Sequence, residues 1–134
     1  MSEPARKLDR VYTYADYKLW SDDERWELIE GTAWSMSPAP AMRHQAIVAT
    51  VTRIAGTWCA GRRCAVFPAP FDVLLPDRPD EPEDQVTSVV QPDVSVICDR
   101  SRLRDWGCYG APDLAVEILS PYTTRKDLNE KYAL

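Results

Sequence analysis

Residues 91–97 read Gln91-Pro-Asp-Val-Ser-Val-Ile97, a short apolar run that carries one carboxylate, Asp93. A second run, Asp113-Leu-Ala-Val-Glu-Ile-Leu-Ser120, carries Glu117 in the same way. Both predict core strands, where a charged side chain is costly unless it is paired, neutralised or bound to a cation. Two acids on neighbouring strands suit a hard divalent cation such as Mg²⁺. An arginine-paired structural acid is the alternative that the residues alone leave open.

Around these two runs, the hydrophobic pattern alternates between helical and strand periods. A helix capped by Thr13 and Asp16 is expected to stop near Ser21, and Glu30-Gly31 breaks residues 25–36 into a β-hairpin. Further strands are expected at 64–67, 71–75, 88–98 and 113–119, and a final helix over 123–134. The pattern predicts an α/β or α+β fold in a single domain of 134 residues, without internal repeats.

The longest predicted element is an amphipathic helix over 41–60, ended by Gly61. Its apolar positions recur at helical spacing and are Ile47, Val48, Val51, Ile54, Ala55 and Trp58.

Charge is unevenly distributed along the chain, whose formal net charge is −5. The proline-rich segment 76–84 holds five acids and is expected to be an exposed loop, whereas residues 31–71 contain no acid. That acid-free stretch contains the only histidine and four arginines: His44, Arg43, Arg53, Arg62 and Arg63. Such a basic stretch can hold phosphates, although a solvated helix face explains it equally well.

The N-terminal ten residues alternate in charge and lack the apolar core of a secretory signal, so we expect a cytoplasmic protein. The apolar stretch at 46–60 is too short to span a bilayer, and we expect no membrane partner. In that setting four cysteines, Cys59, Cys64, Cys98 and Cys108, are expected to be reduced thiols. Their spacing disfavours a structural zinc site.

Six stretches in one order along the chain carry a resemblance to a known family. They are Tyr14-Ala-Asp-Tyr, Trp26-Glu-Leu-Ile-Glu-Gly31, Arg43-His-Gln-Ala-Ile47, Phe67-Pro-Ala-Pro-Phe-Asp-Val73, Gln91-Pro-Asp-Val-Ser-Val96 and Val116-Glu-Ile-Leu-Ser-Pro121. The sequence resembles a large bacterial family of restriction-endonuclease type, a group of domains of unknown function within the PD-(D/E)xK nuclease superfamily. The resemblance implies a restriction-endonuclease-like core, with a mixed sheet flanked by helices.

This resemblance implies the catalytic residues of a Mg²⁺-dependent (or Mn²⁺-dependent) DNA endonuclease without an organic cofactor. Asp93 and Glu117 match the two metal-binding acids. The superfamily lysine is expected at position 119, where this chain has Leu119, so the resemblance assigns the lysine role to Lys131 of the following helix. Further site candidates are Lys126, Glu27, Glu30 and His44, and candidates for holding the DNA backbone are Arg43, Arg62 and Arg63.

An alternative class of function is a catalytically silent binding or dimerisation module that keeps the nuclease fold. Leu119 favours it, because an apolar side chain cannot activate a water. Relative to the family the chain is expected to lack a C-terminal part, since it ends at Leu134 within the lysine-bearing helix. With either function we expect a homodimer, because the chain has five Trp and six Tyr to bury and nucleases pair their sites to cut two strands.

Overall fold

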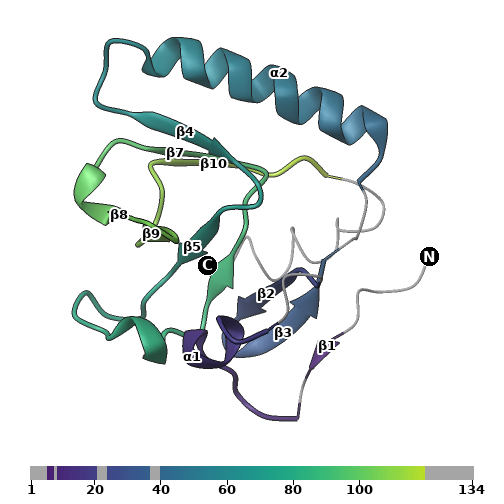
Figure 1. The fold of residues 1–134 in the computed structure, drawn as a ribbon, viewed down its shortest axis with the longest axis vertical. Coiled ribbons are helices and arrows are strands. Elements are labelled where there is room, and N and C mark those ends of the chain that lie inside the picture. The colour runs from purple at the N-terminus through teal and green to yellow at the C-terminus, as the bar shows by residue number, and fades with distance from the viewer. Residues whose placement is uncertain (1–5, 8, 21–23, 37–39, 120–134) are drawn as a thin grey trace. The chain divides into compact units, whose positions relative to one another are not determined.

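The computed structural model describes residues 6–7, 9–20, 24–36 and 40–119 (Figure 1). The chain divides into two compact units, which are described separately. Unit 1 comprises Met1–Ala39, Leu74–Val90 and Leu119–Leu134, and unit 2 comprises Pro40–Val73 and Gln91–Ile118. The predicted helix over 123–134 lies outside the described residues, and with it Lys126 and Lys131.

Unit 1 is built on the predicted hairpin, β2 (Trp26–Ile29) and β3 (Thr32–Ser35). β1 (Arg6–Lys7) pairs antiparallel with β3, and β6 (Val89–Val90) pairs antiparallel with β2. The turn residues Glu30 and Gly31 both have positive φ, 49° and 83°, as a two-residue hairpin turn requires. A side chain at Gly31 would collide with Val11. The hairpin prediction is therefore confirmed.

The short helix α1 (Tyr14–Tyr17) is followed later in unit 1 by the 3-10 turn η1 (Glu83–Gln85). The Asp16 carboxylate accepts a hydrogen bond from the Thr13 backbone N–H at 3.0 Å, and this bond lowers the pKa of Asp16. The capping prediction is confirmed, but α1 ends at Tyr17, before the expected stop near Ser21.

Unit 2 contains a three-stranded antiparallel sheet in the order β10-β7-β4 (Figure 1). β7 (Val94–Ile97) is central and wholly buried, between β4 (Ala65–Pro68) and β10 (Leu114–Val116). Because β7 is the central strand and both of its faces are covered, its sequence is a nearly continuous apolar run. The long helix α2 (Met42–Cys59) packs against β4 and β7, within the bounds predicted for it.

The remaining elements of unit 2 are η2 (Arg100–Arg102), β8 (Leu103–Arg104) and β9 (Gly107–Tyr109), the last two forming a hairpin. β5 (Asp72–Leu74) is the neighbour of β9 and begins in this unit. The expected strands at 64–67, 71–75 and 113–119 thus correspond to β4, β5 and β10.

The prediction of a single strand over 88–98 was wrong. The chain forms two strands there, β6 and β7, separated by Gln91-Pro-Asp93 and belonging to different units. Pro92 has no backbone N–H to donate, so it interrupts a sheet ladder at this point.

The inward face of α2 also differs from the prediction. Val48, Val51 and Ala55 are half-buried toward the sheet, but Ile54 and Trp58 are 57% and 53% exposed. Ile47 is 42% exposed as well. At about 100° per residue, the three half-buried positions lie along one side of the apolar stripe and the three exposed positions along the other, so the sheet covers only one side of it.

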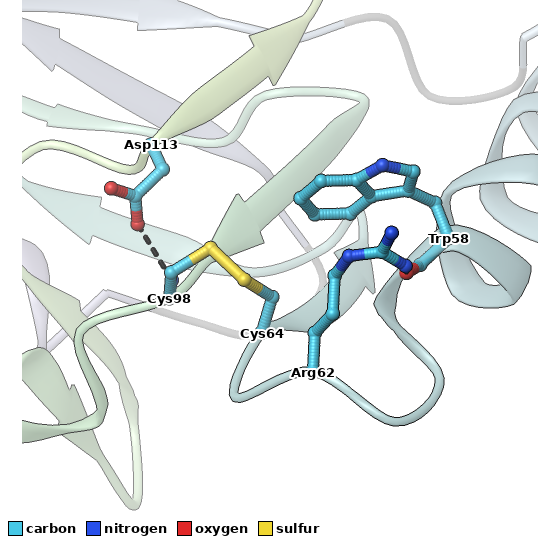
Figure 2. The surroundings of a disulfide bond; sticks show 5 residues. All are labelled: Trp58, Arg62, Cys64, Cys98 and Asp113. Carbon is cyan, nitrogen blue, oxygen red and sulfur yellow. Dashed lines mark hydrogen bonds between the residues drawn. A yellow bond between two sulfur atoms is a disulfide. The ribbon is translucent and has the colours of Figure 1, made fainter.

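The cysteine expectation was wrong for two of the four residues. Cys64 and Cys98 form a disulfide (Figure 2), whereas Cys59 and Cys108 are free and buried. The antiparallel register of β4 and β7 pairs Ala65 with Ile97. Cys64 precedes Ala65 and Cys98 follows Ile97, so the two cysteines face each other across the strands. The Asp113 carboxylate accepts a hydrogen bond from the Cys98 backbone N–H at 2.6 Å (Figure 2).

Reduction of this disulfide should lower the free energy of unfolding by about 4 kcal/mol, because the bond closes a loop with a sequence separation of 34 residues. Urea unfolding with and without dithiothreitol measures the change. The Cys64→Ser variant is the control, since reductant should leave its midpoint unchanged. Four alkylatable thiols in denatured protein that was never reduced would contradict the bond.

Candidate functional site

Asp93 and Glu117 lie at facing ends of two paired strands. The last pair of the β7–β10 register joins Val94 to Val116. Asp93 comes just before this pair on one strand and Glu117 just after it on the other. Continuing the antiparallel register by one residue therefore places Glu117 opposite Asp93. The sequence-based expectation that the two acids lie on neighbouring strands is confirmed.

The backbone around Asp93 holds this residue on both sides. Its carboxylate Oδ2 accepts a hydrogen bond from the Ile118 backbone N–H at 2.7 Å. Its carbonyl oxygen accepts one from the Ala69 N–H, just beyond β4, at 3.0 Å. Charged acceptors make the stronger hydrogen bonds in proteins, so the bond from Ile118 fixes the orientation of the carboxylate.

His44 joins the same site from the first turn of α2. Its Nε2 lies 3.4 Å from Asp93 Oδ2, and the two side chains are 16% and 17% exposed. His44 precedes Val48 by four residues, which puts it on the inward helix face with Val48, Val51 and Ala55. That spacing was the available sequence signal that His44 faces the sheet. The other ring nitrogen, Nδ1, lies 2.9 Å from Gln45 Oε1.

The partners of Asp93 bear on the alternative of an arginine-paired structural acid. Among the residues that the structure describes, the side chain that lies at salt-bridge distance from the Asp93 carboxylate is the His44 imidazole, and no arginine or lysine lies that close. Glu117 is half-buried and also has an interaction partner. An acid held by a backbone amide and an imidazole keeps a negative potential that a cation can neutralise.

The donor set fits a magnesium ion. Mg²⁺ takes one or two carboxylates and completes its shell with water and phosphate oxygens, and Asp93 and Glu117 supply two carboxylates at adjacent strand ends. Over residues 6–7, 9–20, 24–36 and 40–119, no group of three or more His, Cys, Asp and Glu side chains could enclose a metal ion. With two carboxylates as ligands, the rest of a Mg²⁺ shell would be oxygens of water or phosphate.

The other predicted acids belong to unit 1. Glu27 is fully buried in β2 opposite Trp34, and it has an interaction partner. Glu30 is exposed at the hairpin turn, where its backbone N–H donates to Ser88 Oγ at 3.1 Å. Leu119, at the position where the superfamily has its lysine, is 50% exposed.

The predicted arginines are exposed but lie at opposite ends of α2. Arg43 is in the first turn, beside His44, whereas Arg62 and Arg63 follow the last turn. The helix rises about 1.5 Å per residue, so Arg43 lies about 24 Å from the helix end at Cys59. The Arg62 guanidinium stacks 4.4 Å over the Trp58 ring and donates to the Trp58 carbonyl oxygen (Figure 2). Of these three arginines, Arg43 is the one adjacent in sequence to His44, whose imidazole lies beside Asp93.

These features are those of a restriction-endonuclease-like protein: an α+β core with two acids at the ends of paired strands. The Uma2 family, described as "Putative restriction endonuclease", matches residues 14–134. The chain belongs to this family and so to the PD-(D/E)xK superfamily, and its fold class is the one expected from sequence. No curated protein matches the chain. In the part of the chain that the structure describes, no helix has the length and apolarity needed to cross a membrane.

Removing the Asp93 carboxylate should lower the stability of the fold, independently of any effect on activity. Asp93→Ala leaves the part-buried Ile118 N–H without its acceptor, which should lower the free energy of unfolding by about 1–3 kcal/mol. Asp93→Asn keeps an oxygen acceptor and should lose less than half of that. Urea unfolding measures both, with exposed Asp80→Asn as the control. Equal losses in Asp93→Asn and Asp93→Ala would show that the hydrogen bond to Ile118 contributes little.

Proposed function

We propose that this protein is a metal-dependent DNA endonuclease that hydrolyses phosphodiester bonds. The observation that supports it is the register of β7 and β10, which puts Asp93 and Glu117 opposite each other at paired strand ends, with His44 Nε2 3.4 Å from Asp93. Membership of a restriction endonuclease family supports a nucleic-acid substrate. Asp93 and Glu117 would hold Mg²⁺ or Mn²⁺, and no organic cofactor is required.

Hydrolysis of a phosphodiester needs an attacking water, a stabilised leaving group and neutralisation of the charge that develops on the phosphoryl oxygens. A bound divalent ion supplies positive charge and a more acidic water. The Ile118 N–H orients the Asp93 carboxylate, and His44 borders it at 3.4 Å. We propose His44 as a positioning residue, because a side chain on the sheet-facing side of α2 limits how the carboxylate can rotate.

The proposed mechanism includes a catalytic lysine, which the family resemblance implies. Lys131 would orient the attacking water or offset phosphate charge, with Lys126 as the substitute. Glu27 and Glu30 remain candidates for additional roles in the same reaction.

A second candidate function is a catalytically silent DNA-binding or dimerisation module. The observation in its favour is Leu119, an exposed apolar side chain where the superfamily has its lysine. With either function we propose a homodimer. The exposed Ile54 and Trp58 of α2 are apolar surface that a second copy of this chain could cover.

Metal titration and plasmid cleavage on the same samples test the endonuclease proposal. Calorimetry with Mg²⁺ and Mn²⁺ should show binding to the wild type and at least tenfold weaker binding to Asp93→Asn and Glu117→Gln. Cleavage should fall at least a hundredfold in both, because the carboxylates hold the ion. Asp77→Asn, in the exposed acidic loop, is the matched control and should behave as wild type.

Unchanged cleavage in both site variants would refute the assignment. The absence of both metal binding and cleavage in the wild type would favour the silent module. Sedimentation equilibrium on the wild-type sample measures the oligomeric state, and a monomer at all concentrations would refute the homodimer.

The position of Arg43 predicts a specific effect on DNA binding. In the cleavage-deficient Asp93→Asn background, adding Arg43→Ala should reduce the slope of log K against log salt by about 0.9, the value for one lost phosphate contact on duplex DNA. Arg63→Ala should leave the slope unchanged, because this side chain follows the other end of α2. Fluorescence anisotropy of a labelled duplex measures both slopes. Equal reductions would place the DNA along the whole helix.

A further inference from the structure

A pocket of about 280 Å³ lies within unit 2, separate from the acids already assigned. Three chain segments form it: the start of β5, the residue before Pro92, and the two-residue turn between β8 and β9. The lining residues that carry the argument are Phe71, Asp72, Gln91, Asp105, Trp106 and Gly107.

Glycine at position 107 allows the β8–β9 turn to lie directly against β5. Gly107 has φ +155°, and a Cβ there would collide with the Asp72 carbonyl oxygen. Any larger residue would push the turn away, so close packing fixes Asp105 and Trp106 beside Asp72. The pocket is therefore formed by packed backbone, and its two walls are set before a ligand arrives.

The charged groups of the pocket are carboxylates, which accept hydrogen bonds. Asp72 and Asp105 contribute two carboxylates, and no arginine or lysine is among the lining residues. The Gln91 side chain is 7% exposed, and its Nε2 donates to Asp72 Oδ1 at 2.9 Å. Two carboxylates repel a phosphate and attract a group that presents N–H donors.

The apolar walls of the pocket are aromatic. Trp106 and Phe71 both line it, and the Phe71 ring stacks on Phe67 with centroids 4.4 Å apart and planes 3° apart. Stacking on Phe67 holds the Phe71 ring in one orientation. Aromatic faces bind flat rings by stacking, and the cavity lies at the lower limit of small-molecule pockets, about 300 Å³, which suits one ring system. The walls and the acceptors together define a flat ligand with N–H donors on its edge.

We propose that this pocket binds one unpaired nucleobase of the DNA substrate, with guanine preferred. The Watson–Crick edge of guanine offers two adjacent donors, N1–H and the N2 amino group, which a carboxylate accepts together. Thymine offers a single N–H between two carbonyl oxygens that a carboxylate repels. Because base pairing occupies this edge in a duplex, the base must be single-stranded or turned out of the helix. This inference rests on the proposed nuclease function.

The chain links this pocket to the candidate metal site. Gln91 lines the pocket and Asp93 lies two residues further on, so their Cα atoms are at most about 7 Å apart. That separation is about two nucleotide rises of a DNA strand. A base held beside Gln91 would therefore belong to a nucleotide next to the phosphate at Asp93, and the pocket would select where the strand is cut.

Nucleosides, which carry no phosphate, test the pocket directly. Ligand-observed NMR without metal should show guanosine binding to the wild type, with thymidine binding at least tenfold more weakly. Asp105→Asn should weaken guanosine binding at least tenfold, and its exposed turn position makes it a mild change for folding. Trp106→Ala should do the same through lost stacking. Asp80→Asn, an exposed acid outside the pocket, should leave the affinity unchanged.

Equal affinity for guanosine and thymidine, or no binding of either, would overturn the proposal. Tighter binding of N-acetyl-arginine amide than of guanosine would also overturn it, in favour of a peptide ligand. The same titration on Asp93→Asn separates the two proposals. Retained guanosine binding with no wild-type cleavage would support the pocket and refute the nuclease. Asp93-dependent cleavage without nucleoside binding would refute the pocket alone.

Discussion

The pairing of β10 with β7 is the constraint on which the candidate site depends. Its register, Val94 to Val116, carries Asp93 and Glu117 to the same edge and aims the Ile118 N–H at the Asp93 carboxylate. A slip of one residue would turn the side chains of β10 to the opposite face and remove one acid from the site. Two hydrogen bonds at the start of β10 hold this register: the Asp113 N–H donates to the Val96 carbonyl oxygen at 2.9 Å, and the Cys98 N–H donates to the Asp113 carboxylate at 2.6 Å.

The Asp93 carboxylate is stabilised by partners that are neutral or weakly basic. A backbone amide and an imidazole satisfy the Asp93 carboxylate, and both leave its charge largely in place. A lysine or arginine partner would have cancelled that charge and made the acid structural. The arrangement thus keeps a local attraction for cations at the Asp93 side chain, which is 17% exposed and so can be reached by solvent and substrate.

Two places in unit 2 carry charge of opposite sign. The α2 segment carries arginines and no acid, whereas the pocket beside Gln91 carries carboxylates and no lysine or arginine. In the proposed complex this division matches the chemistry of a nucleic acid, in which the backbone is anionic and the base edges carry neutral N–H donors. Arg43 would meet phosphate while Asp72 and Asp105 would meet a base. The overall charge of −5 gives no indication of this division.

Local chemistry determined much of the fold in advance, because turns, caps and periodic elements depend on nearby residues. Glu30-Gly31 required positive φ, Asp16 capped the first helix, and α2 and the strands other than 88–98 fell near their predicted bounds. The acids Asp93 and Glu117 were also evident, since a charge inside an apolar run is visible in sequence. Only tertiary structure decided which cysteines bond, which side of α2 faces the sheet, and that Gln91, Asp72 and Trp106 share a pocket. Each of these depends on contacts between segments far apart in the chain, and such contacts leave no periodicity for the sequence to show.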